Sequence, residues 1–219
     1  MENNIICCLH MCLYPKNKFS NNGQERIIQY RDCLLKFFEY NNIFQGNKVD
    51  IIICDNSINK NEELPFEIKN IIPSNVKVYY DLYNDYGAIN KGCGLIDKWL
   101  KNISIIEKYK WLIHFEPRQM LINFDFFDNF LKEPRNLFKL LSSDNTNYYN
   151  HFYTGLFSIE ISLLINYIKN VNLNYMCNNK ISIEYDLFNY FKINKILFYK
   201  IDKLNLIQHD YMANCNLLV

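Results

Sequence analysis

Short, nearly continuous apolar runs constrain this sequence more than any other feature. Residues 4–9 (NIICCL), 49–54 (VDIIIC) and 111–115 (WLIHF) carry almost only apolar side chains, which is typical of strands buried on both faces. Residues 76–80 form a shorter run of the same kind. Between the first two runs, residues 26–40 carry apolar side chains at helical spacing. The predicted order β-α-β-β-α-β indicates an α/β fold with a mostly parallel central sheet and helices on both faces.

The second half of the sequence predicts further helices and strands and no internal repeat. They are a helix at 124–131, strands at 136–141 and 152–159, helices at 160–169 and 183–191, and a strand at 195–201. Pro65 and Pro73 predict a loop over residues 59–74. No linker divides the chain, and its length of 219 residues suits a single α/β domain.

Charge and composition exclude several classes of protein. The formal net charge is +1, with Lys and Arg scattered among Asp and Glu, so no nucleic-acid partner is predicted. No apolar stretch approaches the roughly 20 residues of a membrane span, and residues 1–4 lack the basic start of a signal peptide. The eight cysteines form neither a CxxC pair nor a cluster with zinc spacing, which favours reduced thiols. We therefore expect a protein of the cytoplasm (the host cytoplasm if its source is viral).

Arginine is rare in this sequence and occurs only at positions 26, 31, 118 and 135. Asn, Ile, Lys and Tyr, whose codons are AT-rich, are used heavily, so lysine is the default cation. Arginine differs from lysine in its planar group, which can bind a phosphate or carboxylate through two parallel hydrogen bonds. An arginine that persists against this bias is therefore a candidate for a role that needs this geometry.

Residues that follow the predicted strands are the first candidates for a binding site, because ligands of open α/β sheets bind at the carboxyl ends of the strands. Leu9 ends the first predicted strand and His10 follows it, and Asp55 follows the second. The Asp55 carboxylate could accept hydrogen bonds from a ribose hydroxyl or a base N–H, or it could form an Asx turn or a helix cap. The sequence favours neither interpretation.

The segment at 84–94 (NDYGAINKGCG) combines small residues with the expected start of a helix. Small residues let the backbone approach a ligand, and the free N–H groups of a helix start suit a diphosphate. The segment is neither GxGxxG nor a P-loop. It resembles the N-x-G-x-x-x-N-x-G-like segment of GT-A glycosyltransferases, with these residues in approximate register: Asn84, Gly87, Asn90 and Gly92 or Gly94. The resemblance implies a single GT-A (Rossmann-like) domain that binds a nucleotide sugar.

The end of the fourth strand departs from this family. The resemblance implies an Asp-x-Asp motif there, which holds a divalent metal on the diphosphate, but this sequence has HFEPR at 114–118. Glu116 is a candidate single carboxylate ligand for Mn²⁺ or Mg²⁺, and the resemblance implies the late His209 as a second ligand. Alternatively, Arg118 neutralises the diphosphate directly, or Glu116 and Arg118 form an ordinary ion pair at a turn.

Two later segments resemble the acceptor side of the same fold. Residues 151–157 (HFYTGLF) resemble its xxGxF strand, and residues 182–188 (SIEYDLF) resemble the helix that presents an acid to the acceptor. An inverting transferase needs one carboxylate to take the proton of the attacking hydroxyl. Glu184 is the first candidate for this base and Asp186 the second. Either could equally be a solvated acid near a helix N-terminus.

These resemblances imply a glycosyltransferase that moves a sugar from a nucleoside diphosphate sugar, with UDP as the expected nucleotide, to a saccharide or glycoprotein acceptor. Residues 1–120 would bind the nucleotide sugar and residues 121–219 the acceptor. An inverting reaction is favoured. The missing Asp-x-Asp motif leaves open a second hypothesis, a catalytically silent GT-A scaffold that binds a sugar or a protein partner.

Overall fold

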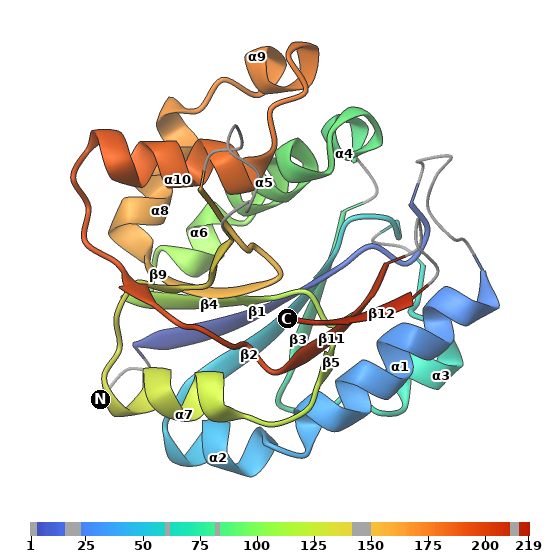
Figure 1. Cartoon of the computed structure of the whole chain (residues 1–219). Helices are drawn as coiled ribbons and strands as arrows, with labels where there is room; N and C mark the ends of the chain where they lie inside the picture. Colours follow the sequence, from blue (N-terminus) through green and yellow to red (C-terminus); the bar gives the residue numbers. More distant parts are fainter. Residues whose placement is uncertain (1–3, 16–22, 60–61, 82–83, 142–149, 211–214) are drawn as a thin grey trace.

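The computed structural model describes residues 4–15, 23–59, 62–81, 84–141, 150–210 and 215–219. Its centre is a seven-stranded sheet with the strand order β10-β6-β9-β4-β1-β2-β3 (Figure 1). The strands are β1 (Ile5–Met11), β2 (Val49–Asp55), β3 (Lys77–Tyr80), β4 (Trp111–Phe115), β6 (Leu137–Phe138), β9 (Leu156–Glu160) and β10 (Tyr199–Lys200). Strand β9 runs antiparallel to β4 and β6, and the other neighbouring pairs are parallel. The prediction of a mostly parallel sheet is confirmed.

Helices cover both faces of this sheet, as predicted (Figure 1). One face carries α1 (Gln24–Phe38), α2 (Asn41–Gly46), α3 (Phe66–Lys69) and α7 (Asp125–Lys132). The other carries α4 (Asp85–Ile89), α5 (Lys91–Lys101), α6 (Ile103–Ile106), α8 (Ile161–Asn170), α9 (Leu173–Asn178) and α10 (Ile183–Ile193). Each face buries its own apolar core, which explains why the strands have no polar side.

The alternation of side chains along the strands decides which of them reach each face. In β1, Cys7 and Leu9 pack into the core beneath α1, whereas Cys8 packs into the core beneath α5. His10 of β1 and His114 of β4 follow the second pattern. The ring of Trp99 in α5 meets the His114 ring edge-on, with centroids 5.5 Å apart. The two histidines therefore stand on the α5 side, where β1 and β4 end.

The shortest strands differ most from the sequence prediction. The predicted strand at 136–141 divides at Lys139, because β6 joins the main sheet and β7 (Leu140–Leu141) pairs with β8 (His151–Phe152) in a separate ladder. The predicted strand at 195–201 narrows to β10. A further small sheet, not predicted, consists of β5 (Met120–Leu121), β11 (Leu206–Asp210) and β12 (Cys215–Leu218). Runs of two residues have no periodicity to detect, so their pairing partners define them.

Strands from both predicted halves of the chain share the central sheet, since β1 to β4 come from residues 1–120 and β6, β9 and β10 from residues 121–219.

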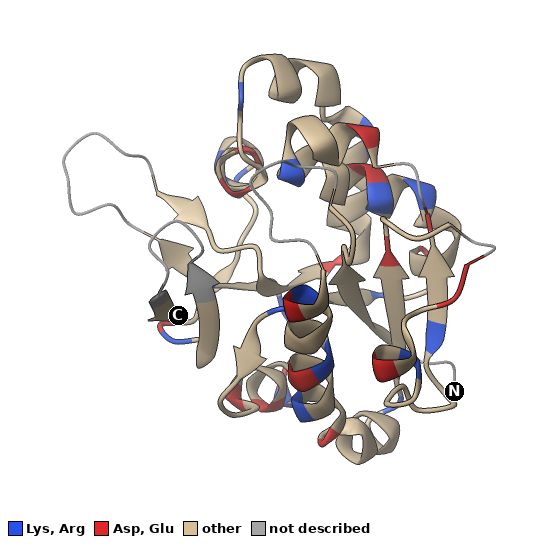
Figure 2. Ribbon diagram, turned by 90° about the vertical axis from the view of Figure 1, so that its right-hand side faces the viewer, with Lys and Arg blue, Asp and Glu red and all other residues tan. Residues whose placement is uncertain are grey.

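Figure 2 shows Lys and Arg interspersed with Asp and Glu along the helices. Within the part of the chain that the structure describes, no helix has both the length and the apolar character needed to cross a membrane.

Candidate functional site

A pocket of about 190 Å³ lies at the carboxyl ends of β1 and β4, between α1 on one side and α4, α5 and α10 on the other. Open α/β sheets bind their ligands at such strand ends. The predicted site residues that line it are His10, Asn84, Gly87, Glu116, Arg118 and Glu184. The fold thus brings together candidates that lie far apart in the sequence.

The α1 side of the pocket is cationic and is formed by Arg26. This side chain is only 4% exposed. Its Nε donates a hydrogen bond of 2.6 Å to the carbonyl of Cys12, and its guanidinium lies 5.5 Å from the centre of the Tyr30 ring. The Tyr30 hydroxyl in turn accepts a hydrogen bond from the Cys12 backbone N–H at 3.0 Å. Among the described residues, Nη1 of Arg26 has no hydrogen-bond partner although it is buried.

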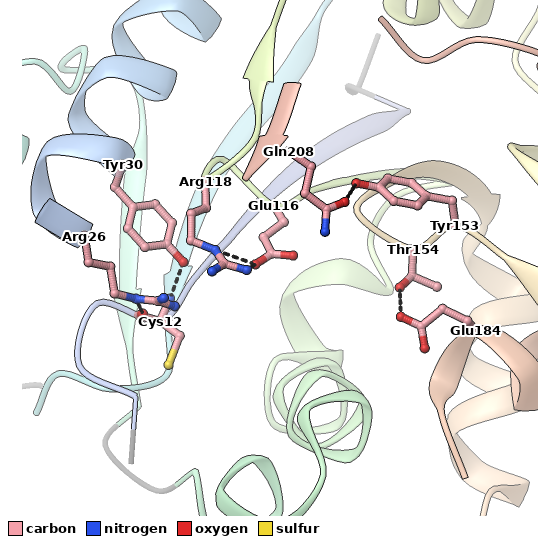
Figure 3. Close-up of polar contacts among 9 residues, drawn as sticks. All are labelled: Cys12, Arg26, Tyr30, Glu116, Arg118, Tyr153, Thr154, Glu184 and Gln208. Carbon is pink, nitrogen blue, oxygen red and sulfur yellow. Dashed lines mark hydrogen bonds and ion pairs between the residues drawn. The ribbon is translucent and has the colours of Figure 1, made fainter. Parts of the chain in front are cut away.

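Next to Arg26, the end of β4 presents an ion pair between Glu116 and Arg118 (Figure 3). Oε1 of Glu116 accepts hydrogen bonds from Nε and Nη2 of Arg118 at 3.2 and 3.1 Å. The backbone N–H of Glu116 is fixed by the carbonyl of Gly155 at 2.8 Å. Burial acts to raise the pKa of Glu116, but the charges of Arg118 and Arg26 outweigh it and hold this pKa below its usual value. One ionised carboxylate therefore lies beside two guanidinium groups.

The wall nearest the sheet is polar but uncharged. Burial lowers the pKa of His114 to about 4. Burial, together with the neighbouring His114 and Lys98 side chains, also lowers the pKa of His10 well below its usual value. Both imidazoles are therefore neutral at pH 7. Both ring nitrogens of His10, Nδ1 of His114 and Oδ1 of Asn84 are buried without a partner among the described residues. Such groups suit hydroxyl or amide groups of a ligand.

The α10 side of the pocket carries the carboxylate of Glu184. Helix α10 begins at a Ser182 cap, whose hydroxyl accepts a hydrogen bond from the Tyr185 backbone N–H at 3.3 Å. Oε1 of Glu184 accepts a hydrogen bond of 2.8 Å from the hydroxyl of Thr154. Figure 3 shows that Glu184 and Thr154 reach the pocket from the side opposite Arg26. The cationic side and this carboxylate thus border one cavity.

Asp186, the second predicted base, points elsewhere. Its Oδ2 accepts a hydrogen bond of 2.9 Å from the Tyr167 hydroxyl, and it does not line the pocket. Burial raises the pKa of Asp186, although the Tyr167 hydroxyl opposes this shift. The geometry therefore separates the two acids and brings only Glu184 to the cavity.

Leu9 and Asp55 lie beneath the pocket rather than in it. Leu9 is fully buried in the core beneath α1. The Asp55 side chain is also fully buried. Its Oδ1 accepts hydrogen bonds from the Ser57 hydroxyl and from two backbone N–H groups, and its Oδ2 accepts one from the Leu13 N–H. In the structure Asp55 therefore forms an Asx-type turn with Ser57 and Ile58. Its hydrogen bond from the Leu13 N–H also fixes the chain after β1.

Asn90 also lies outside the pocket lining. Asn90 caps α5: its Oδ1 accepts from the N–H of Gly92 at 3.0 Å, and its Nδ2 donates to the carbonyl of Ile181 at 2.8 Å. This cap occupies helix-start N–H groups that the sequence assigned to a ligand. His209 lies in β11, opposite Asn216 of β12. Its side chain is outside what the structure describes.

The described residues around Glu116 do not fit a divalent metal. No group of three His, Cys, Asp or Glu side chains in the described ranges could hold a metal ion. One oxygen of Glu116 is already bonded to Arg118, and Arg26 acts on it electrostatically. Mn²⁺ or Mg²⁺ at this site stays a prediction, which the described residues do not support.

Arg26, Tyr30 and Thr154 also line the pocket, although none of them follows a predicted parallel strand. They lie on α1 and before β9, so the rule that ligands bind after parallel strands does not select them. For Arg26 a signal exists, because two of the four arginines, Arg26 and Arg118, line the pocket.

Comparisons with known proteins identify the class of fold. No family model matches the sequence, and no curated protein is significantly similar to it. The structure is similar to that of a candidate nucleotide-diphospho-sugar transferase from Desulfovibrio desulfuricans G20, at 10% identity and a TM-score of 0.56, covering 92% of this chain and 80% of that one. The fold is therefore the GT-A-like fold found in nucleotide-sugar transferases.

The Saccharomyces cerevisiae mannosyltransferase Ktr4p is a more distant structural match. Two of its structures, one of them in complex with GDP, give a TM-score of 0.42 with 14% and 12% identity. They cover 76% and 86% of this chain, and the chain spans 59% and 62% of the Ktr4p chains.

Proposed function

We propose that this protein is a glycosyltransferase that moves a sugar from a nucleoside diphosphate sugar to a hydroxyl group of a saccharide or glycoprotein. The observation that carries the proposal is the arrangement of charge in the pocket. Arg26 and Arg118 lie at one side and Glu184 at the other, at the strand ends of a GT-A-like fold. This arrangement suits a ligand with an anionic diphosphate at one end and a proton to be removed at the other.

In the proposed reaction, the acceptor hydroxyl oxygen attacks the anomeric carbon of the donor sugar. Glu184 takes the proton of that hydroxyl, and the bond from the anomeric carbon to the diphosphate oxygen breaks. The electron pair leaves with the nucleoside diphosphate, whose added negative charge lies next to the arginines. A single displacement of this kind inverts the anomeric centre. The Thr154 hydroxyl, 2.8 Å from Glu184, holds the carboxylate in place.

The uncharged wall of the pocket has a role in the same proposal. His10, His114 and Asn84 offer buried nitrogen and oxygen atoms that have no partner among the described residues. Neutral imidazoles can both donate and accept hydrogen bonds, as sugar and ribose hydroxyls do. The neutral wall would therefore orient the uncharged part of the donor. UDP as the nucleotide and the cytoplasm as the location stay predictions.

The experiment pairs two acids of one helix. The release of UDP from a panel of UDP-sugars is measured with and without saccharide acceptors, for wild type, Glu184→Gln and the matched control Asp186→Asn. We expect Glu184→Gln to lower turnover by roughly 10²–10⁴-fold with unchanged UDP affinity, and Asp186→Asn to retain turnover. UDP binding without turnover on any donor would favour the silent scaffold. If neither UDP nor GDP, nor any sugar conjugate of the two, binds or turns over, the proposal is wrong.

A further inference from the structure

The buried guanidinium of Arg26 is not explained by the fold alone. Burying a charge is costly unless the charge is paired and hydrogen-bonded. Arg26 is 4% exposed, and two contacts hold it, with the Cys12 carbonyl and with the Tyr30 ring. Both contacts fix the position of the guanidinium and neither neutralises it, and the nearby Glu116 carboxylate is already paired with Arg118. Its buried Nη1 has no partner among the described residues and belongs to a side chain that lines the pocket. This geometry points to an anionic ligand.

A second observation concerns the charge balance around Glu116. The Asp, Glu, Lys and Arg side chains that line the pocket are Arg26, Lys91, Glu116, Arg118 and Glu184. Glu116 and Arg118 pair with each other, and Glu184 of α10 and Lys91 of α5 belong to the side of the cavity opposite α1. Arg26 is thus the surplus positive charge at the end of the pocket where β4 finishes. A dianionic group placed there would meet two guanidinium groups and one carboxylate.

A divalent cation does not fit the same place. To bind Glu116, it would compete with the two hydrogen bonds from Arg118 and lie beside the charge of Arg26. Like charges repel strongly in a partly buried site, where water screens them less. The described residues also provide no group of three metal ligands. The residue that stands where the family carries Asp-x-Asp therefore holds an arginine instead of a metal.

From these contacts we infer that Arg26 and Arg118 supply the counter-charge for the donor's diphosphate, in place of a divalent metal. The inference rests on the proposed function and deepens it. Guanidinium groups suit this role because their planar N–H groups match phosphate oxygens in pairs. Glu116 acts as a positioning residue, since it orients Arg118 and offsets part of the positive charge of the two guanidinium groups before the ligand arrives.

The test measures binding of UDP and of inorganic pyrophosphate by calorimetry, in excess EDTA and then in Mn²⁺. The variants are Arg26→Gln and Arg118→Gln, with Arg31→Gln as a matched control. Arg31 lies on the same helix as Arg26 but is 37% exposed and pairs with Asp32. We expect wild type and the control to bind equally well in EDTA. Each pocket variant should bind UDP about 10- to 100-fold more weakly, with a smaller loss for UMP, which carries one phosphate.

The direction in which Glu116→Gln changes the affinity for UDP distinguishes the two possible roles of Glu116. If Glu116 positions Arg118, Glu116→Gln removes a negative charge beside the diphosphate, and UDP affinity stays within about threefold of wild type or rises. If Glu116 is a metal ligand, the same variant loses affinity in Mn²⁺. Should Arg26→Gln fail to fold, Arg26→Lys and Arg118→Gln test the same point, because lysine keeps the charge without the planar group.

Two results would overturn the inference and leave the proposed function intact. They are binding of UDP that requires Mn²⁺, and binding in EDTA that Arg26→Gln and Arg118→Gln do not weaken. If neither UDP, GDP nor pyrophosphate binds under either condition, the inference and the proposed function fail together. The metal dependence thus distinguishes failure of the inference from failure of the function on which it rests.

Discussion

The side chain of Asp55 offers a sharp test of how the loops around the pocket are held. It is fully buried and accepts four hydrogen bonds, from the Leu13 N–H at 3.1 Å, the Ser57 N–H and hydroxyl at 2.7 Å each, and the Ile58 N–H at 2.9 Å. One carboxylate thus ties the chain after β1 to the chain after β2. We expect Asp55→Asn to lower the stability of the fold and to leave nucleotide affinity unchanged.

The expected loss of stability in Asp55→Asn follows from the hydrogen bonds that the asparagine amide can keep. Oδ1 of an asparagine can accept the three hydrogen bonds from Ser57 and Ile58, but its NH₂ group would face the Leu13 N–H, donor against donor. A buried donor left without an acceptor costs about 1–3 kcal/mol. Asp55→Ala removes the acceptors of three backbone N–H groups and should cost about 3–6 kcal/mol, a large part of the roughly 5–15 kcal/mol that stabilises a typical domain.

Equilibrium unfolding in urea measures this cost, with Asp32→Asn as the control. Asp32 is 40% exposed and pairs with Arg31, so its loss should change the free energy of unfolding by at most about 1 kcal/mol. Calorimetry with UDP gives the affinity of each variant. If Asp55→Asn is as stable as Asp32→Asn and binds UDP more weakly, the carboxylate contacts the ligand and the structural role argued for it is refuted.

Three further predictions concern stability. Burial lowers the pKa of His114 to about 4 in the folded state, whereas its ordinary value of 6.5 applies in the unfolded state. The free energy of unfolding should therefore decrease by up to about 3 kcal/mol as the pH falls from 6.5 to 4. His114→Phe should remove this decrease when unfolding in urea is measured across that pH range. Gly94→Ala places a Cβ 2.6 Å from the Cα of Gly87 and should lower the melting temperature, whereas Gly46→Ala, with open space, should not. Asn90→Ala removes the α5 cap and should lower the free energy of unfolding, measured with urea, by about 1 kcal/mol.

The long strands could be predicted because burial on both faces leaves a continuous apolar run. The run at 49–54 corresponds to β2 (Val49–Asp55) and the run at 111–115 to β4 (Trp111–Phe115). The two-residue strands could not be predicted, since their hydrogen-bond partners are distant in sequence. Met120 of β5, for example, pairs with Ile207. Local propensity carries no information about such pairings.

The site residues, too, could be predicted only in part. Strand ends and small-residue segments indicated where a pocket forms, and Glu116, Arg118 and Glu184 do line it. The sequence could not tell whether a polar side chain would bind a ligand or the protein's own backbone. Asp55 and Asn90 are suited to both tasks, because the oxygen that would accept from a ribose also accepts from backbone N–H groups. Only the packed structure shows that their backbone partners are in place.

Arg26 shows why the sequence indicates the cationic part of the site only weakly. It lies in the first turn of α1, where the helix dipole disfavours a positive charge, and Gly23 before it provides no side-chain cap. Burial disfavours the charge again. Every local rule therefore argues against an arginine at this position, and such conflicts are expected mainly at functional sites. The conflict becomes visible only when the fold sets Arg26 beside Arg118, because a dianionic ligand between them would compensate both costs at once.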